Sequence, residues 1–263
     1  MFGWQCFSPD AYFCSKYDSY SYNMEIIYLH HSGFVIKTND VVLIIDFFED
    51  SESESCGVVH DKILHEDVPL YVLSSHFHAD HFNRQILGWK DAKDDIKYIF
   101  SHDIYKRRRV KKDAAVWLKK GEVYADNHIK VTAFGSTDVC ISFLIELEGK
   151  TLFHAGDLNN WHWMDESPEK EWKRDEQKFL EELHLIQEQY GQVDVAMFPI
   201  DPRLGKEYMR GGKQFIRAIR TSTFIPMHFW NDYAAANVFQ EYARLHSVNA
   251  PEIRHRGQVF ADL

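Results

Sequence analysis

The sequence predicts an α/β fold, and three observations support this prediction. Runs of β-branched residues between positions 25 and 46 are separated by turn residues, which is the pattern of a strand meander. A charged stretch from 168 to 189 carries apolar residues at helical spacing. After it, strand-like and helix-like stretches alternate. Strand-rich halves separated by helices are typical of layered α/β proteins.

In chain order, apolar runs predict strands and amphipathic runs predict helices. We expect strands at 26–29, 34–36, 41–45, 68–73, 96–100, 141–145, 151–154, 193–199, 223–228 and 259–260, with two more between 122 and 133. We expect helices at 82–89, 168–189, 213–220 and 234–245. The acidic, serine-rich residues 49–62 indicate a solvated loop, and the basic cluster at 106–112 indicates a charged helix face or loop rather than an RNA contact.

Length and composition limit the class of protein. The chain has 263 residues, 27% of them charged, and a net charge of −10, which does not favour binding to nucleic acid or anionic lipid. No apolar run is as long as a membrane span, and residues 1–23 do not resemble a secretory signal. The four cysteines have no metal-binding spacing. We therefore expect a cytoplasmic protein, with an N-terminal extension of uncertain role at 1–23 and a single domain at 24–263.

Four potential metal ligands follow the apolar run 68–73 within six residues, and these are His76, His78, Asp80 and His81. Imidazole and carboxylate groups are zinc ligands. If the run continues as a strand, His76 and His78 project to the same side at its end. Asp80 and His81 then lie on the following turn, where they could face a second metal. Surface or core histidines are the alternative in a chain with 15 of them, but burying such groups without partners is costly.

Two other strands end in polar residues. The run 151–154 continues into Gly156-Asp157, and the run 223–227 ends in His228. Asp46 also ends an apolar run, so it either orients a metal ligand or caps a turn. His154 is compatible with a supporting role or with the core.

The pattern His76-x-His78-x-Asp80-His81 resembles the signature of the metallo-β-lactamase superfamily. His31-Ser32-Gly33, Gly156-Asp157 and His228 follow that family's order of motifs. The resemblance is greatest to the ascorbate-6-phosphate-lactonase-like branch of small cytoplasmic hydrolases. It implies a four-layer α/β/β/α sandwich with the metals at one edge.

The resemblance also implies a ligand set. His76, His78 and Asp157 would bind one metal, and Asp80, His81, Asp157 and His228 a second, with Asp157 as the bridge. Many members have a further histidine where this chain has Gly135, so one or two ions are compatible with the sequence. Ser136, Thr137, Asp138 or water are the candidates to complete the first position. His30 and His31 are not expected to be ligands.

The expected function is metal-dependent hydrolysis, with zinc as the favoured ion and manganese or iron as alternatives. A metal-bound hydroxide would attack a small ester, lactone or phosphodiester, with Asp80 and Asp157 as catalytic residues. The candidates for substrate binding are Trp161, His162, Trp163, Arg203 and Trp230, although the tryptophans could simply pack a loop and Arg203 could form a structural salt bridge. The alternatives are a noncatalytic metal-binding scaffold and a nuclease-type phosphodiesterase. We expect a small-molecule substrate and neither a membrane nor a nucleic acid as partner.

Overall fold

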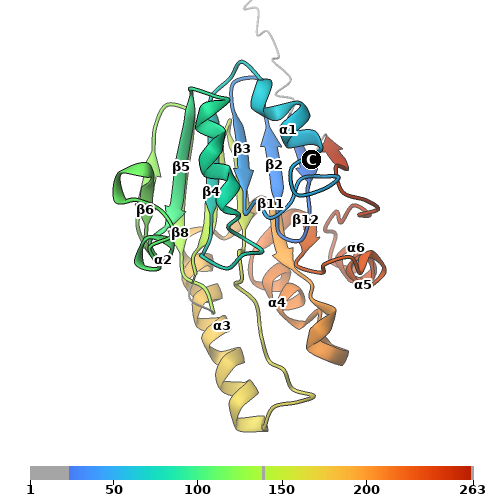
Figure 1. The fold of residues 1–263 in the computed structure, drawn as a ribbon. Helices are drawn as coiled ribbons and strands as arrows, with labels where there is room; N and C mark the ends of the chain where they lie inside the picture. Colours follow the sequence, from blue (N-terminus) through green and yellow to red (C-terminus); the bar gives the residue numbers. More distant parts are fainter. Residues whose placement is uncertain (1–23, 138–139, 262–263) are drawn as a thin grey trace, which may run out of the picture.

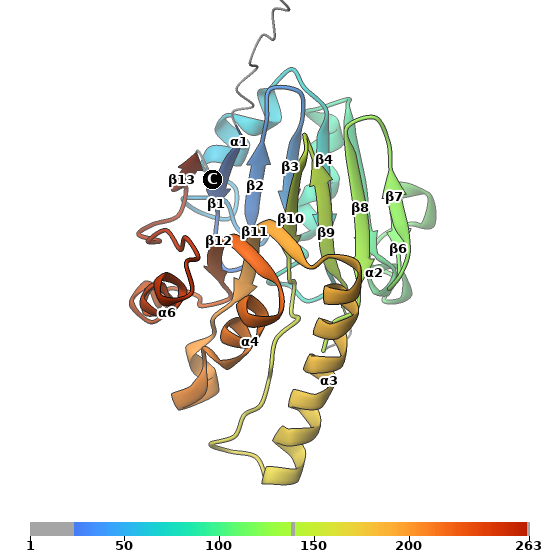
Figure 2. The ribbon, with the colours of Figure 1, turned by 180° about the vertical axis from the view of Figure 1, so that it is seen from behind.

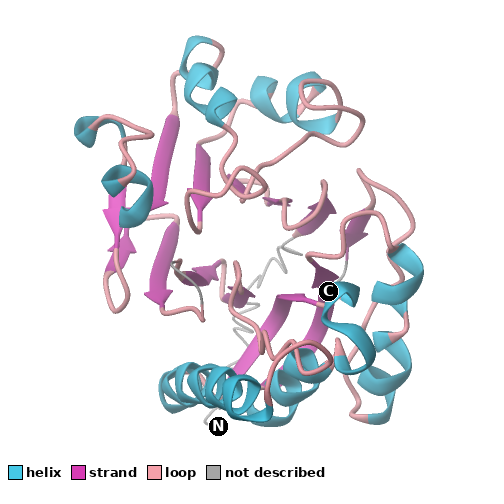
Figure 3. Cartoon of the chain, turned by 60° about the horizontal axis from the view of Figure 1, so that its bottom comes forward, coloured by secondary structure: helices cyan, strands magenta, loops and turns pink. Residues whose placement is uncertain are grey.

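Two β-sheets pack face to face, and helices cover the outer side of each sheet (Figures 1 and 3). This arrangement, in a computed structural model that describes residues 24–137 and 140–261, confirms the predicted α/β sandwich. The proposed extension 1–23 and the candidate ligand Asp138 lie outside the described residues.

The first sheet has seven strands in the order β13-β1-β2-β3-β4-β5-β6. These are β1 (Glu25–Tyr28), β2 (Phe34–Lys37), β3 (Val42–Ile45), β4 (Leu70–Ser74), β5 (Ile96–Ser101), β6 (Val116–Leu118) and β13 (Val259–Ala261). Strands β1, β2 and β3 form the expected antiparallel meander, whereas β3, β4, β5 and β6 are parallel. Because parallel strands end at the same edge, Asp46 and the loop after Ser74 emerge side by side.

The second sheet has six strands in the order β12-β11-β10-β9-β8-β7. These are β7 (Val123–Ala125), β8 (Ile129–Phe134), β9 (Ser142–Leu147), β10 (Lys150–His154), β11 (Gln192–Pro199) and β12 (Arg220–Met227). Strands β10, β11 and β12 are parallel. Their common edge therefore carries the polar residues that follow each strand, which are Asp157, Asp201 and His228.

Six α-helices lie in the described residues. These are α1 (Val58–Asp61), α2 (His102–Lys106), α3 (Glu169–Gln189), α4 (Arg210–Ala218), α5 (Tyr233–Asn237) and α6 (Phe239–Leu245). Figure 2 shows α3 and α4 on the outer face of the second sheet. Helix α3 buries Phe179, Leu183 and Ile186, whose spacing of four and three residues puts them on one stripe. No helix in residues 24–137 and 140–261 combines the length and hydropathy needed to cross a membrane.

Three predicted elements differ from the observed ones. The expected loop 49–62 contains α1, because the buried carboxylate of Asp50 accepts the backbone N–H groups of Val59 and His60 at 3.0 and 2.9 Å. The expected helix 82–89 is a 3₁₀ helix over Arg84–Asp91, and the expected helix 234–245 is divided into α5 and α6. Strand β6 has only three residues, too few to show a hydrophobic period.

Candidate metal centre

The loop from Ser75 to His81 begins where β4 ends, at Ser74. His76 and His78 therefore lie on a loop and not at the end of a strand, contrary to expectation. The cause is Asp46, whose carboxylate accepts both the backbone N–H and the hydroxyl of Ser75 at 2.7 Å. The two histidines still meet, because Nε2 of His76 is 2.9 Å from Nδ1 of His78.

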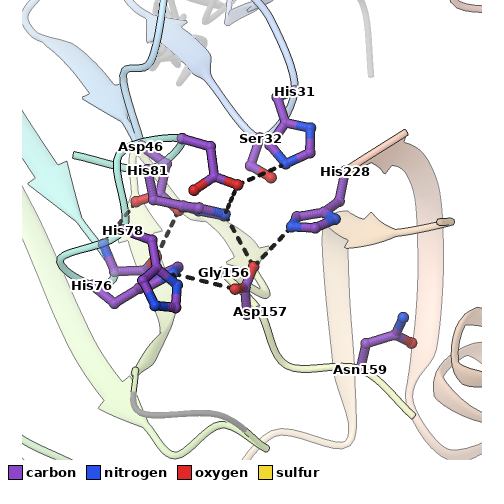
Figure 4. Close-up of polar contacts among 12 residues, drawn as sticks. His31, Ser32, Asp46, His76, His78, His81, Gly156, Asp157, Asn159 and His228 are labelled. Atoms are coloured by element: carbon purple, nitrogen blue, oxygen red, sulfur yellow. Dashed lines mark hydrogen bonds and ion pairs between the residues drawn. The ribbon is translucent and has the colours of Figure 1, made fainter. Parts of the chain in front are cut away.

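Asp157 lies at the centre of the cluster of side chains in Figure 4. Its Oδ2 is 3.2 Å from Nε2 of His76, and its Oδ1 is 3.0 and 3.2 Å from the Nε2 atoms of His81 and His228. Ligands about 2.0–2.2 Å from one metal are spaced about 3 Å from each other, so this spacing suits a shared cation. Oδ1 of Asp157 and Nε2 of His81 are buried and form an ion pair that lacks good hydrogen-bond geometry. The donor set therefore fits a metal, and the two Asp157 oxygens face opposite groups of histidines.

The turn before Asp157 requires glycine. Gly156 has φ +54°, and a Cβ atom there would lie 2.9 Å from both Cβ of Ser75 and the carbonyl oxygen of Ile141. His154 supports the same turn: its Nδ1 accepts the N–H of Gly156, and its Nε2 donates to the carbonyl of Ser32 at 2.9 Å. His154 is thus a buried structural residue that connects two segments of the site.

Two histidines of the cluster are oriented by buried carboxylates. Nδ1 of His81 is 2.7 Å from Oδ2 of Asp46, and Nδ1 of His228 is 2.9 Å from Oδ2 of Asp201. Each contact leaves Nε2 facing Asp157. The placement of Asp46 favours the orienting interpretation over the turn cap. Asp201, which follows the predicted strand 193–199, is a site residue that the sequence did not predict.

The charges of the cluster depend on one another. Burial alone would raise the pKa of Asp157, but His81 and His228 outweigh it and hold that pKa well below the ordinary value. Burial lowers the pKa of His81, yet the carboxylates of Asp157 and Asp46 raise it well above the ordinary value. The negative charges of the buried carboxylates therefore favour the protonated imidazole of His81. A bound cation could balance those negative charges in place of the proton.

His31, which was not expected to be a ligand, belongs to this cluster. It is fully buried, its Nε2 lies 3.3 Å from Oδ2 of Asp80, and its ring centroid is 4.0 Å from that of His228. Burial, followed by the charge of His228, lowers the pKa of His31 to about 3, so its imidazole is neutral. Candidate ligand atoms of His31, Asp80, His81 and His228 lie within 4.8 Å of one another, as do those of His76, His81 and Asp157.

The space beside Gly135 is already filled. A Cβ atom at this position would lie 2.4 Å from Oε2 of Glu182, which reaches over from α3 and pairs with Lys120. Of the candidates to complete the first metal position, Thr137 donates its hydroxyl to the carbonyl of Asn159 at 2.7 Å.

A cavity of about 460 Å³ opens next to the cluster. Its wall consists of His78, Asp80, Thr137, Asp157, Trp161, Trp163, Asp175, Lys178, Arg203 and His228. Three of the predicted substrate contacts, Trp161, Trp163 and Arg203, are therefore at the cavity. The two tryptophan rings are nearly parallel, at 15°, with centroids 6.4 Å apart.

The other two predicted substrate contacts lie elsewhere. His162 is buried; its Nε2 is 3.2 Å from the carbonyl of Glu207, and its Nδ1 accepts the N–H of Met164. The prediction for His162 was wrong, because both nitrogens of its buried ring contact backbone groups and the ring does not line the cavity. Trp230 does not line the cavity, and its ring lies 4.2 Å from that of His31.

Strained backbone conformations gather at this edge of the sheets. Among the described residues, eight other than glycine have positive φ. Five of them are in or beside the cluster: His31, Asp46, Trp163, His228 and Trp230. Such strain persists where the surrounding structure enforces it, and it is typical of functional sites.

Comparison with known proteins agrees with this geometry. Residues 25–171 match the family described as the beta-lactamase superfamily domain. A UPF0173 metal-dependent hydrolase from Pyrococcus abyssi is 25% identical over 220 residues, which cover 78% of this chain and 84% of that protein. Another from Symbiobacterium thermophilum is 27% identical over 250 residues, covering 90% and 99%.

A solved structure shows the same fold. Igni18, a metallo hydrolase from Ignicoccus hospitalis, superposes with a TM-score of 0.66 at 18% identity, over 92% of this chain and 99% of that chain. The chain therefore belongs to the beta-lactamase superfamily.

Proposed function

We propose that this protein hydrolyses a small-molecule ester, lactone or phosphodiester, with zinc as its metal. The observation that carries the proposal is the position of Asp157, whose two carboxylate oxygens face His76 on one side and His81 and His228 on the other. We assign His76, His78 and Asp157 to one metal position and Asp80, His81, Asp157 and His228 to the second.

When bound, zinc would supply a Lewis acid that lowers the pKa of water to about 7 and polarises the group under attack. Asp157 would hold the two positions together. Asp80 lines the cavity, and its side chain is about one quarter exposed (26%), so its carboxylate can orient water that enters. Burial would raise the pKa of Asp80, but the rings of His31 and His81 outweigh it and hold this pKa below the ordinary value. Asp80 therefore remains an anionic acceptor for that water.

The cavity supports a small substrate. Its volume is within the range of small-molecule sites, and Trp161 and Trp163 provide an apolar wall. Lys178 and Arg203 add positive charge, although each is paired with a carboxylate, Asp175 and Asp201 respectively. These cations favour an ester, lactone or phosphodiester that carries a negative charge. We also propose a cytoplasmic location, because the four cysteines are scattered along the sequence as expected of reduced thiols.

The test is hydrolysis of a panel of lactones, thioesters, esters, phosphodiesters and an RNA oligonucleotide by the zinc-loaded protein. We expect turnover of at least one small substrate, and its loss in Asp157→Asn and His78→Ala variants that still fold. His184→Ala, an exposed histidine of α3, is the matched control and should keep full activity.

Two results would contradict the proposal. A folded, metal-loaded protein inert toward the whole panel would favour the noncatalytic scaffold. Cleavage of the RNA oligonucleotide alone would favour a nuclease.

A further inference from the structure

We propose that His31 is a fifth protein donor at the second metal position, which makes that position the tighter of the two. The proposal rests on the dinuclear assignment above. It adds His31 to the ligands that the family resemblance implies and predicts unequal affinities for the two ions.

The backbone of His31 is held in place from both sides. Its N–H donates to the hydroxyl of Tyr28 at 3.0 Å, and its carbonyl accepts the N–H of His228 at 3.0 Å. Its φ of +57° is unusual for histidine, and the turn enforces it. The ring of Trp230 covers the imidazole on one side, at a centroid distance of 4.2 Å. The structure thus fixes this ring beside His228 and opposite Asp80.

The ring of His31 is fully buried; its Nδ1 has no hydrogen-bond partner, and its Nε2 lies 3.3 Å from Oδ2 of Asp80 without good hydrogen-bond geometry. Its neighbour His30 is also buried, and its Nδ1 has only a 3.3 Å ion-pair contact with Glu49, but its Nε2 has a hydrogen-bond partner in Arg256 at 2.8 Å. A buried polar atom without a partner is costly, and native structures rarely keep one without a reason. A cation among His31, Asp80, His81 and His228 would bind Nε2 of His31. Figure 4 shows the ring of His31 beside that of His228.

Counting donors then distinguishes the two positions. The second position has five candidates: His31, Asp80, His81, Asp157 and His228. The first has three, His76, His78 and Asp157, because position 135 is glycine and its side-chain space holds Glu182. Catalytic zinc sites commonly use three protein ligands and closed structural sites use four. The first ion should therefore exchange readily, whereas the second should remain bound.

The test is zinc affinity of the full chain, measured by competition with a chromophoric chelator. His31→Asn removes the imidazole and keeps a residue that tolerates positive φ. His31→Gln keeps an amide that can donate a hydrogen bond to Asp80 but is a poor zinc ligand. His30→Asn is the matched control, since it alters the adjacent buried histidine.

We expect one tight and one weak zinc in the wild type. Both His31 variants should weaken the tight site by at least about 100-fold, because removing even an outer-shell partner costs 10–100-fold. His30→Asn should stay close to wild type. Bound cobalt should absorb visible light more strongly in the His31 variants, because absorption increases as the number of ligands falls.

The outcomes separate this inference from the proposed function. Wild-type zinc affinity in His31→Asn would overturn this inference but not the proposed function. Wild-type zinc affinity and wild-type cobalt absorption in His31→Gln would also overturn it, because they would mean that His31 forms a hydrogen bond and does not bind the metal. A wild-type protein that binds no zinc at all would overturn the proposed function as well.

Discussion

The role of Asp201 in orienting His228 follows from the contacts of its carboxylate. It is fully buried, accepts bonds from both His228 and Arg203, and these partners outweigh burial to lower its pKa to about 2. We predict that Asp201→Asn reduces kcat/KM and zinc affinity by about 10–100-fold, because Nδ1 of His228 loses its anionic partner. Steady-state kinetics and chelator competition measure this change.

The matched control for that experiment is Asp194→Asn. Asp194 lies on β11, the strand that precedes Asp201, and accepts the N–H of Thr151 away from the cluster. An equal loss in both variants would mean that the effect of Asp201 is one of folding rather than of ligand orientation.

Gly135 provides a second test on a single residue. A Cβ atom there would lie 2.4 Å from the Glu182 carboxylate, so Gly135→Ala forces that side chain to move. We predict a loss of at most about 1 kcal/mol in unfolding free energy by urea denaturation, because only the end of a flexible side chain and its exposed pair with Lys120 are displaced. In a Glu182→Ala background the same substitution should cost much less, and equal costs in the two backgrounds would rule out the contact.

Among the elements, the turn between β7 and β8 connects the two sheets through Asp126. Its carboxylate accepts bonds from Tyr71 of β4 at 2.6 Å, Lys97 of β5 at 3.0 Å and Tyr124 of β7. Although burial opposes it, these bonds lower the pKa of Asp126 below its ordinary value. The charged carboxylate is therefore the form that stabilises the fold.

We predict that Asp126→Asn lowers the unfolding free energy by about 1.5–3 kcal/mol at pH 7. The folded-state pKa is depressed, so the contribution of Asp126 is present above the unfolded value of about 4 and is lost as the pH falls below it. The gap between wild type and variant in urea denaturation should therefore narrow from pH 5 to pH 3. A gap that widened on acidification would contradict this assignment.

The strands that carry the site were predictable because each is a long apolar run that ends in polar residues. Strands β3, β4, β10 and β12 lead into Asp46, the loop 75–81, Asp157 and His228, and parallel pairing gathers those ends at one edge. The apolar runs in the sequence, and the polar residues that follow them, therefore predicted most residues of the metal cluster.

His31, Asp201 and His162 were not predictable in the same way. His31 follows an antiparallel strand, and it joins the cluster through contacts with residues far away in the sequence, such as that of its carbonyl with the N–H of His228. Asp201 resembles an ordinary turn residue until its distance to His228 is known. The direction of His162 depends on the path of an irregular loop, which hydrophobic periodicity does not encode.

On the scale of the whole molecule, the metal should also stabilise the fold. The proposed ligands come from both sheets, with His76, His78, Asp80 and His81 after β4, Asp157 after β10 and His228 after β12. A ligand that binds only the folded state adds about 2.7 kcal/mol at 100 times its dissociation constant. We predict a higher Tm with added zinc than with chelator, in thermal unfolding of the same sample. A much smaller difference should remain in His81→Ala, and an equal difference would place the zinc elsewhere.

The most direct test of the account is the metal content of the chain. Protein purified without chelator should contain between about one and two equivalents of metal by elemental analysis, as expected for one tight and one exchangeable position. His228→Ala should lose the tightly held equivalent, and activity on the hydrolysed substrate should fall with it. Absence of metal in the wild type, even after loading with zinc or manganese, would contradict the proposed centre and the hydrolytic mechanism built on it.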